Sequence, residues 1–144
     1  MNIGILGAGN IAGSMARTIC GMAAQGRPVT LYAVASRSQE KADAFAKAYG
    51  IPRAYGSYAA MLNDPLVELV YIATPHSHHA EQICQCVAAG KPVLCEKSFT
   101  ANAKQAEEVL QEAEAAGVYV AEAIWTRYMP ARGMIADIIA SGEI

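Results

Sequence analysis

The chain has 144 residues, of which 53% are hydrophobic and 17% are charged, a balance that suits one globular domain with a sizeable core. Its formal net charge at pH 7 is -2, and its lysines and arginines form no run that could neutralise a series of phosphates. We therefore expect neither a nucleic-acid partner nor binding to an anionic membrane. No apolar run approaches the roughly 20 residues needed to span a bilayer, and no basic region precedes the first apolar run as in a signal peptide.

The four cysteines all lie inside apolar segments: Cys20, Cys84, Cys86 and Cys95. They are not arranged in the loop-rich framework that disulfides hold together in secreted scaffolds. The sequence therefore predicts that they are reduced, small core residues of a cytoplasmic protein.

Short apolar or β-branched runs alternate with longer helical patterns along the chain. In chain order the sequence predicts strands over 2–6, 29–35, 69–74, 91–95 and 117–122. The helices predicted between and after them span 10–24, 38–49, 77–89, 102–116 and 130–144, of which the last is amphipathic. A capping box of Asn102 and Gln105 opens the helix over 102–116, and a weaker region over 53–65 holds a short strand and a short helix capped by Ser57. Strands that are apolar on both faces and alternate with helices predict a parallel sheet covered on both sides. The predicted fold class is α/β, with a doubly wound parallel sheet.

The first strand runs into a glycine-rich turn that fits the pattern G-x-G-x-x-[GA]. Gly7 permits the tight turn, Gly9 lets the backbone approach a pyrophosphate, and the small Ala12 lets the helix lie close to the sheet. The free N–H groups of the first helical turn, around Asn10 and Ile11, would face an anion. Such a pattern also fits an ordinary turn, but its place between a strand and a helix in a unit of roughly 30 residues favours a dinucleotide site.

The end of the second predicted strand distinguishes between the two nicotinamide cofactors. An acidic residue there would bind the ribose hydroxyl of NAD, whereas a cation would accommodate the 2′-phosphate of NADP. Here Ser36, Arg37 and Ser38 follow the strand, and the first carboxylate is Glu40 in the next helix. NADP is therefore favoured and NAD stays possible, because Arg37 could also stack on adenine in either cofactor or be a solvated surface residue.

Three further strands also end in polar residues, which are Thr74, Pro75 and His76, then Glu96 and Lys97, then Glu122. Parallel strands deliver these groups to one edge of the sheet, where open α/β sheets bind their ligands. A glutamate–lysine pair that ends a strand is by itself more often a surface ion pair. At this edge we expect the pair to face the cofactor.

Five stretches of the chain resemble the Gfo/Idh/MocA oxidoreductase family in order and spacing: GILGAGNIA, AVASRSQEKADAFA, YIATPHSHHAEQ, GKPVLCEKSFT and EAIWTRYMP. The last one is similar to the branch that contains the dimeric dihydrodiol dehydrogenases and related sugar dehydrogenases. The resemblance implies a Rossmann-like NAD(P)-binding domain over 1–122 and a connector and helix over 123–144. It also implies a second α+β domain that this chain does not contain.

The resemblance further implies an NAD(P)-dependent dehydrogenase or reductase. Such an enzyme would move a hydride between the nicotinamide and a hydroxyl or carbonyl carbon of a sugar, a polyol or a dihydrodiol. Its partners would be a small-molecule substrate and, in the full-length protein, a second copy in a dimer. We expect the 144-residue chain alone to be inactive, because the family's acid/base residue lies in the second domain.

The resemblance also assigns roles to single residues. It implies that Lys97 lies beside the nicotinamide and is the main catalytic candidate together with Glu96, and it gives cofactor contacts to Thr74, Pro75, His76, His79, Trp125 and Arg127. The chain departs from the family's pattern at Ser98, where most members have proline, and at His76, where asparagine is frequent. Proline would restrict the backbone of Lys97, and serine relaxes that restriction.

Three alternatives stay open at this point. The fold could serve a non-catalytic NADP-binding sensor or interaction module, although a lysine beside the nicotinamide favours an enzyme. The histidines of HSHH with Cys84 and Cys86 could bind a metal, but two helical residues so spaced project about 200° apart and cannot close one tetrahedral site. Trp125 and Tyr128 could pack between domains or, when uncovered, drive self-association.

Overall fold

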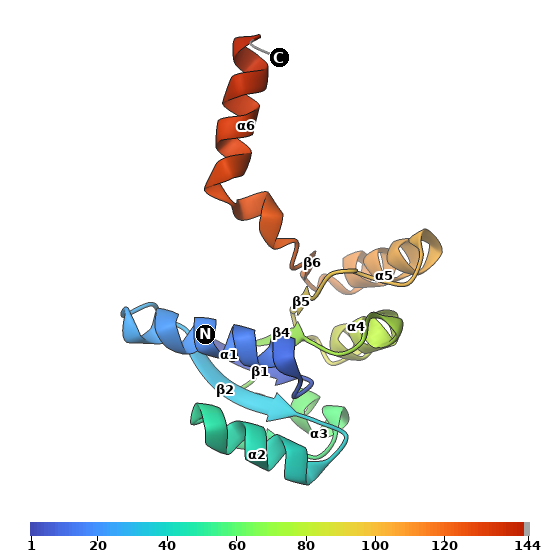
Figure 1. Ribbon diagram of the computed structural model, residues 1–144. Coiled ribbons are helices and arrows are strands. Elements are labelled where there is room, and N and C mark those ends of the chain that lie inside the picture. Colours follow the sequence, from blue (N-terminus) through green and yellow to red (C-terminus); the bar gives the residue numbers. More distant parts are fainter. Residues whose placement is uncertain (143–144) are drawn as a thin grey trace.

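The protein, described by a computed structural model over residues 1–142, is built on a six-stranded, wholly parallel sheet (Figure 1). The strand order is β3-β2-β1-β4-β5-β6, so the order reverses between β1 and β4, in the middle of the sheet. This is the topological switch point at which such sheets bind ligands. The strands are β1 (Asn2–Leu6), β2 (Thr30–Ala35), β3 (Arg53–Tyr55), β4 (Leu69–Ile72), β5 (Val93–Cys95) and β6 (Val120–Glu122).

Helices cover both faces of the sheet, as Figure 1 shows. On one face lie α1 (Asn10–Ala24) and α2 (Gln39–Tyr49), and on the other lie α3 (Tyr58–Leu62), α4 (His79–Ala88) and α5 (Ala103–Ala116). Two short 3-10 helices, η1 (His76–His78) and η2 (Trp125–Tyr128), precede α4 and α6 (Pro130–Ser141). No helix within residues 1–142 is both long and apolar enough to cross a membrane.

The alternation of side chains along each strand explains why both faces are covered. Ile5 and Val34 pack in the core cluster with α1 and α2, whereas Leu6 and Ile72 pack in the cluster with α3, α4 and α5. All four side chains are fully buried. A strand with apolar residues at consecutive positions needs a helix layer on each side, as the sequence predicted.

The predicted elements and their order are confirmed, but β4, β5 and β6 are two or three residues shorter than predicted, and two helices also differ in extent. The helix predicted over 77–89 is divided into η1 and α4, because Pro75 has extended backbone angles and a 3-10 turn opens the segment. The last helix, α6, ends at Ser141 and projects away from the sheet (Figure 1), and residues 143–144 of the prediction lie outside the described part of the chain. Ser57 and Asn102 cap α3 and α5 as predicted.

The prediction that the cysteines lie in or against the core is confirmed for three of the four. Cys86 and Cys95 are fully buried, Cys84 is half-buried, and burial raises the pKa of Cys86 and of Cys95 to about 12. Cys20 is exposed, so the prediction is wrong for this residue. Its neighbour Ile19 takes the buried position on α1, and the next residue of a helix turns away from the sheet.

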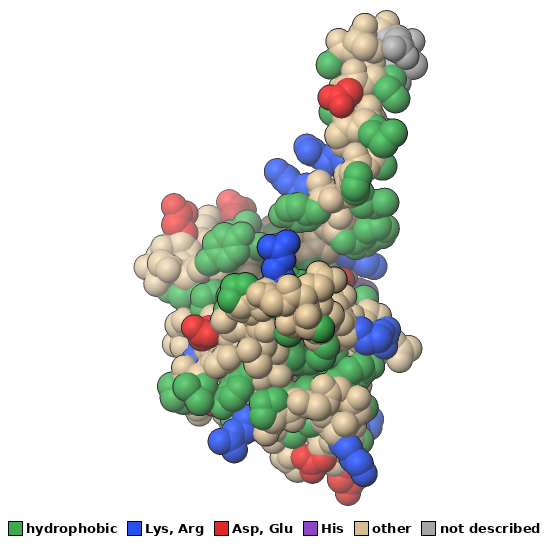
Figure 2. All heavy atoms as spheres, turned by 90° about the vertical axis from the view of Figure 1, so that its left-hand side faces the viewer, with side chains coloured by type: hydrophobic (Ala, Val, Ile, Leu, Met, Phe, Trp, Pro, Cys, Tyr) green, Lys and Arg blue, Asp and Glu red, His purple; other side chains and the backbone are tan. Residues whose placement is uncertain are grey.

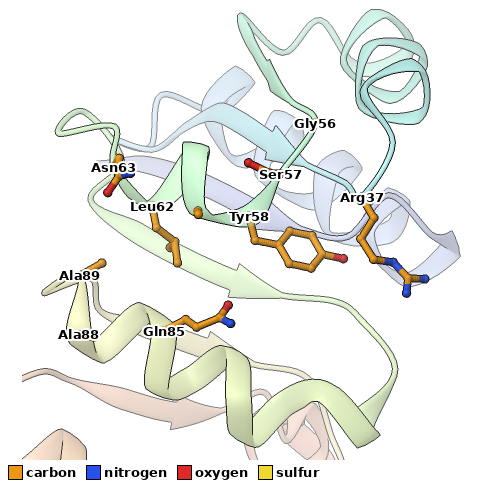
Figure 3. A pocket seen from close by; sticks show the side chains of 10 residues that line it. Arg37, Gly56, Ser57, Tyr58, Leu62, Asn63, Gln85, Ala88 and Ala89 are labelled. Atoms are coloured by element: carbon orange, nitrogen blue, oxygen red, sulfur yellow. The ribbon is translucent and has the colours of Figure 1, made fainter.

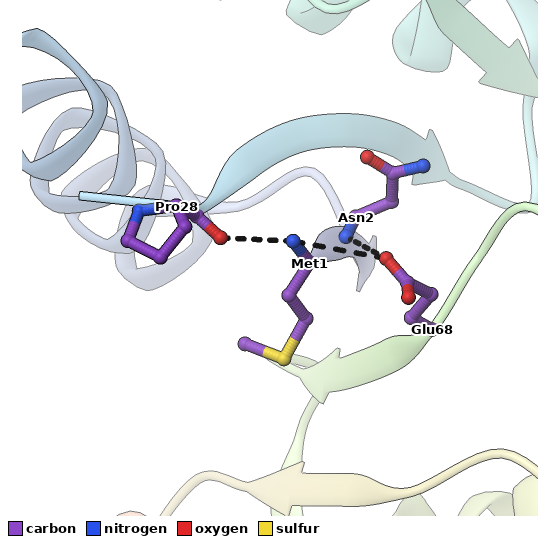
Figure 4. Close-up of polar contacts among 4 residues, drawn as sticks. All are labelled: Met1, Asn2, Pro28 and Glu68. Atoms are coloured by element: carbon purple, nitrogen blue, oxygen red, sulfur yellow. Dashed lines mark hydrogen bonds and ion pairs between the residues drawn. The ribbon is translucent and has the colours of Figure 1, made fainter. Parts of the chain in front are cut away.

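At the amino-terminal edge of the sheet, opposite the carboxyl ends of the strands, contacts of Met1 and Asn2 hold the start of β1 (Figure 4). The amino group of Met1 donates to Pro28 O at 2.8 Å and pairs with Glu68 Oε2 at 3.8 Å, and the backbone N–H of Asn2 donates to the same oxygen at 2.6 Å. These groups are exposed, so the ion pair contributes little to stability. The backbone contacts help to align β1 with both of its neighbours.

A cluster of polar side chains around Asp64 holds the crossover from β3 to β4 in place. Asp64 Oδ2 accepts hydrogen bonds from the hydroxyls of Tyr55 at 2.6 Å and Tyr32 at 3.0 Å, and Oδ1 accepts from the backbone N–H of Leu66 at 2.8 Å. The bond from Tyr55 is the main reason why the pKa of Asp64 lies below its ordinary value of 3.8. The carboxylate raises the pKa of Tyr55 to about 12 in turn, after the larger effect of burial.

We expect Asp64→Asn to lower the free energy of unfolding at pH 7 by about 1 kcal/mol, because an amide accepts weaker hydrogen bonds and solvent screens the site. Since the folded-state pKa of Asp64 is depressed, its contribution is present above pH 3.8 and is lost as the pH falls through the lower folded-state value. Urea denaturation at pH 7 and pH 3 measures both effects. Asp137→Asn on the exposed α6 is the control, and equal losses in the two variants at pH 7 would contradict this role of Asp64.

Candidate functional site

The ends of the strands are aligned across the sheet. The register pairs Leu6 with Ala35 and with Ile72, then Ile72 with Cys95, and Cys95 with Glu122. The segments that follow β1, β2, β4, β5 and β6 therefore leave the sheet at one edge. The predicted site residues come from these five segments.

The glycine loop after β1 makes a close approach that only glycine permits. Gly7 has a φ of 102°, its N–H donates to Ala35 O at 2.9 Å, and an added Cβ would lie 2.9 Å from Ala73 O. The loop is thus held between the ends of β2 and β4. Left-handed backbone and missing space both exclude a larger residue here.

The start of α1 offers an anion site. Gly9 is the N-cap residue, no side chain caps the helix, and the first turn holds no acidic residue. An added Cβ on Gly9 would meet nothing within 4 Å, so the space in front of the helix is open. Asn10 and Ile11 are exposed beside this opening, and Ala12 is fully buried against the sheet. The uncapped N–H groups can therefore face a bound anion.

Ser36 and Arg37 follow β2, at the mouth of a cavity. Ser36 is buried, donates its N–H to Tyr55 O at 3.0 Å and accepts from Ser38 N at 3.4 Å through its hydroxyl. Arg37 is exposed and lines a cavity of about 730 Å³ together with Tyr58. Figure 3 shows the guanidinium of Arg37 and the hydroxyl of Tyr58 at the same end of this space.

A second, smaller cavity links the end of β2 to the end of β4. Its volume is about 210 Å³, and Arg37, Tyr58, Pro75 and His78 line it. Burial raises the pKa of Tyr58, so the phenol stays protonated as a hydrogen-bond donor. The cavity thus lies between the guanidinium of Arg37 on one side and the turn after β4 on the other.

The turn after β4 is anchored by α4. The Thr74 hydroxyl donates to Gln82 Oε1, while Pro75 and His76 are exposed at the edge. His79 differs from Thr74, Pro75 and His76, because its side chain is fully buried. Its Nδ1 lies 2.8 Å from Ser98 O and its Nε2 lies 2.9 Å from Thr74 O.

The side chains of Glu96 and Lys97 have different surroundings, although the two residues are adjacent in the chain. The Tyr71 hydroxyl donates to Glu96 Oε1, and the backbone N–H of Lys97 donates to Glu96 Oε2 at 3.2 Å. Burial, followed by this hydrogen bond, raises the pKa of Tyr71. The Lys97 side chain is exposed and forms no ion pair within residues 1–142. The carboxylate is therefore engaged by Tyr71 and the backbone, and the ammonium is available for a ligand.

A third cavity lies beside this pair, next to the sheet edge at β6. It measures about 430 Å³ and is lined by Glu96, Glu122, Trp125 and Tyr128, among others. Glu122 accepts the N–H of Phe99 at 2.9 Å, and Trp125 is 62% exposed. Arg127 lies on η2 and is exposed, but it does not line this cavity.

Three residues in this arrangement were not predicted from the sequence: Tyr71, Gln82 and Tyr58. Tyr71 and Gln82 bond the predicted residues Glu96 and Thr74, so their role is visible only once strands and helices are packed. A polar-tipped tyrosine in the middle of the strand LVYIAT is the one signal that could have pointed to Tyr71, since a buried hydroxyl needs a partner.

The structure gives no support to the metal hypothesis. Within residues 1–142, no three His, Cys, Asp or Glu side chains are arranged so that they could hold an ion. His79 has both ring nitrogens beside carbonyl oxygens, and Cys86 is in the core.

The sheet order, the glycine loop at the switch point and the open helix start together define a dinucleotide-binding domain of the Rossmann type. The model of an oxidoreductase family with an NAD-binding Rossmann fold, Gfo/Idh/MocA, matches residues 1–124. The chain belongs to this family. Its α/β fold, predicted from the sequence, is confirmed.

Curated relatives and solved structures agree with this assignment. The chain is 40% identical over 141 residues to a trans-1,2-dihydrobenzene-1,2-diol dehydrogenase of Mus musculus, covering 98% of this chain and 42% of the relative. It is 38% identical over 149 residues to a D-xylose 1-dehydrogenase (NADP(+)) of Hypocrea jecorina, covering 98% and 38%. The chain thus spans about two-fifths of the length of these relatives.

Among solved structures, an NAD-binding oxidoreductase from Klebsiella pneumoniae aligns with a TM-score of 0.87 at 34% identity, covering all of this chain and 39% of that one. A 3-ketoreductase from Actinomadura kijaniata, in complex with TDP-benzene and NADP, aligns with a TM-score of 0.90 at 29% identity and covers 100% and 44%. The fold is therefore shared with an NAD-binding oxidoreductase and with a ketoreductase solved with NADP.

The two glycines of the loop should respond differently to a methyl group. Gly7→Ala should lower the free energy of unfolding by about 1 to 3 kcal/mol, because alanine is strained at this φ and meets Ala73 O. Gly9→Ala should change it by less than about 1 kcal/mol, the range of N-cap preferences, yet weaken dinucleotide binding by filling the open space. Thermal denaturation and cofactor titration measure the two effects, and a stable Gly7→Ala variant would contradict the account of the loop.

Proposed function

We propose that the whole protein is an NADP-preferring oxidoreductase and that this chain is its cofactor-binding part. It would transfer a hydride between the nicotinamide and a hydroxyl or carbonyl carbon of a sugar, a polyol or a dihydrodiol. The observation that carries this proposal is the convergence of the open α1 start, Arg37 and the unpaired Lys97 at one sheet edge. The names of the dihydrodiol and D-xylose dehydrogenases among the relatives support the substrate class.

Each part of the edge has a separate task in binding. The N–H groups at the start of α1 hold a pyrophosphate, with Gly9 leaving room for it. Arg37 pairs with a 2′-phosphate, and no carboxylate precedes Glu40 to bind a free ribose hydroxyl. Thr74, Pro75 and His76, which are half-buried or exposed at this edge, would contact the cofactor from the end of β4. NADP is preferred over NAD on this basis, in line with the NADP in the ketoreductase structure.

Lys97 is the proposed catalytic residue of this chain. When bound, the nicotinamide supplies the hydride chemistry. The Lys97 ammonium, which has no partner in residues 1–142, would hold the reacting oxygen of the substrate and stabilise charge that develops on it. Glu96 keeps the lysine in place, because its carboxylate accepts the Lys97 N–H and is itself fixed by Tyr71.

The segment after β6 is proposed to connect this domain to the rest of the protein. We place the boundary between residues 122 and 123, supported by the end of β6 at Glu122 and by α6, which lies apart from the sheet. Figure 2 shows hydrophobic side chains along α6 and at its base, and the preceding η2 carries Trp125 and Arg127; such an exposed apolar surface suits contact with a substrate domain or a second copy. A dimer and a cytoplasmic location remain predictions, and sedimentation of the whole protein as a monomer at all concentrations would contradict the first.

A cofactor titration tests the choice of cofactor. We expect the chain to bind NADPH at least about tenfold more tightly than NADH, and Arg37→Ala to remove most of that difference, because one charge-assisted pair to the 2′-phosphate is lost. Quenching of Trp125 or energy transfer from it to the nicotinamide reports binding. Arg27→Ala, beyond the far end of α1, is the matched control. Tighter binding of NADH, or an unchanged ratio in Arg37→Ala, would contradict the assignment.

Lys97→Met separates an enzyme from a binding module. In the whole protein this substitution should lower kcat for oxidation or reduction of sugars, diols or dicarbonyls by about 100-fold or more, with NADPH affinity within a few-fold of the original. Lys104→Met on the exposed face of α5 should leave both unchanged. Full activity of Lys97→Met would contradict the catalytic role. NADPH binding without any turnover by the unmodified protein would favour the sensor alternative.

A further inference from the structure

His79 is the one buried histidine of the chain's three. It is the first residue of α4 and its side chain is fully buried, whereas His76 and His78 are exposed. A buried ring needs a hydrogen-bond partner for each polar atom. The two partners of His79 come from two different segments of the cofactor edge.

Each ring nitrogen lies beside a backbone carbonyl oxygen. The oxygen of Ser98, at 2.8 Å from Nδ1, belongs to the loop that carries Lys97, and the oxygen of Thr74, at 2.9 Å from Nε2, belongs to the turn after β4. The ring thus bridges the loop with the catalytic candidate and the turn under the proposed cofactor. The two segments follow the neighbouring strands β5 and β4, and they are not adjacent in the sequence.

The number of hydrogens decides what holds the bridge together. A backbone carbonyl only accepts, and a neutral imidazole has one N–H donor and one lone pair. One of the two contacts would then set a nitrogen lone pair against an oxygen lone pair, with no solvent exposure to relieve it. Two donors require hydrogens on both ring nitrogens, and thus the imidazolium form.

The surroundings show what must stabilise that form. The ionisable groups on the elements around His79 are Tyr71 on β4, Cys95 at the end of β5 with Glu96 and Lys97 after it, Lys104, Glu107, Glu108, Glu112 and Glu114 on α5, and His76, His78, Glu81, Cys84 and Cys86 next to or on α4. No ion pair joins the ring to a carboxylate within residues 1–142. The two carbonyl dipoles are therefore its direct partners, and losing either one would leave a buried charge short of compensation.

We propose that His79 is a positioning residue that holds the Lys97 loop against the Thr74–Pro75 turn by donating hydrogen bonds from both ring nitrogens. The proposal rests on the proposed function only in the sense that this loop serves catalysis. It differs from the role that the family resemblance implied, because a fully buried ring with both nitrogens engaged supports the site from below and does not contact the cofactor.

The direct test is the proton count of the ring. In the unmodified chain labelled with ¹⁵N-histidine, long-range ¹H–¹⁵N spectra at pH 7 should show two protonated nitrogens for one slowly exchanging ring, that of His79. A ring nitrogen without hydrogen at His79 would overturn the proposal. This result does not depend on cofactor binding, so it is distinguishable from a failure of the proposed function.

Two variants test the positioning itself. His79→Leu removes both donors and should speed hydrogen exchange of the Ser98 and Phe99 amides and weaken NADPH binding by about tenfold, the effect of one lost buried hydrogen bond. His79→Gln keeps an amide donor and should restore part of both. Unchanged loop exchange in His79→Leu would overturn the proposal. If this variant does not fold, the ring measurement on the unmodified chain still decides.

Discussion

The structure depends on the point where the end of β1 is bonded to both of its neighbours. Gly7 N donates to Ala35 O at 2.9 Å, and Ala73 N donates to Leu6 O at 2.8 Å. These two bonds bring the glycine loop, the end of β2 and the turn after β4 together at the switch point. Since a Cβ on Gly7 would collide with Ala73 O, the contact requires glycine. The cavities at Arg37 and the open start of α1 lie around this contact.

The loop that carries Lys97 is fixed from three elements. Tyr71 of β4 bonds Glu96, His79 of α4 reaches Ser98 O, and Glu122 of β6 accepts the Phe99 N–H. A flexible loop would lose the orientation that catalysis requires, so it is consistent that the backbone is anchored while the lysine side chain stays free. The anchored residues Glu96, Ser98 and Phe99 thus flank the exposed Lys97 side chain, which is the proposed reactive group.

Much of the fold follows from local patterns. Apolar strands, capping residues such as Asn102 and the glycine loop are legible in the sequence because each depends on residues a few positions apart. The contacts that build the site are of another kind. Tyr71 meets Glu96 across 25 residues, and the burial of His79 depends on a carbonyl 19 residues later. Cys20 shows the same limit on a smaller scale, because a step of one residue along α1 decides whether a side chain is buried or exposed.

The central claim is that the five segments at this edge form one NADP site. The most direct measurement is the change in backbone amide shifts of the ¹⁵N-labelled chain on addition of NADPH. The account predicts that the affected amides cluster in residues 7–12, 36–38, 74–76 and 96–99, and that NADH leaves 36–38 less affected. Shifts confined to α5 and α6, or no saturable shifts at the glycine loop, would contradict it.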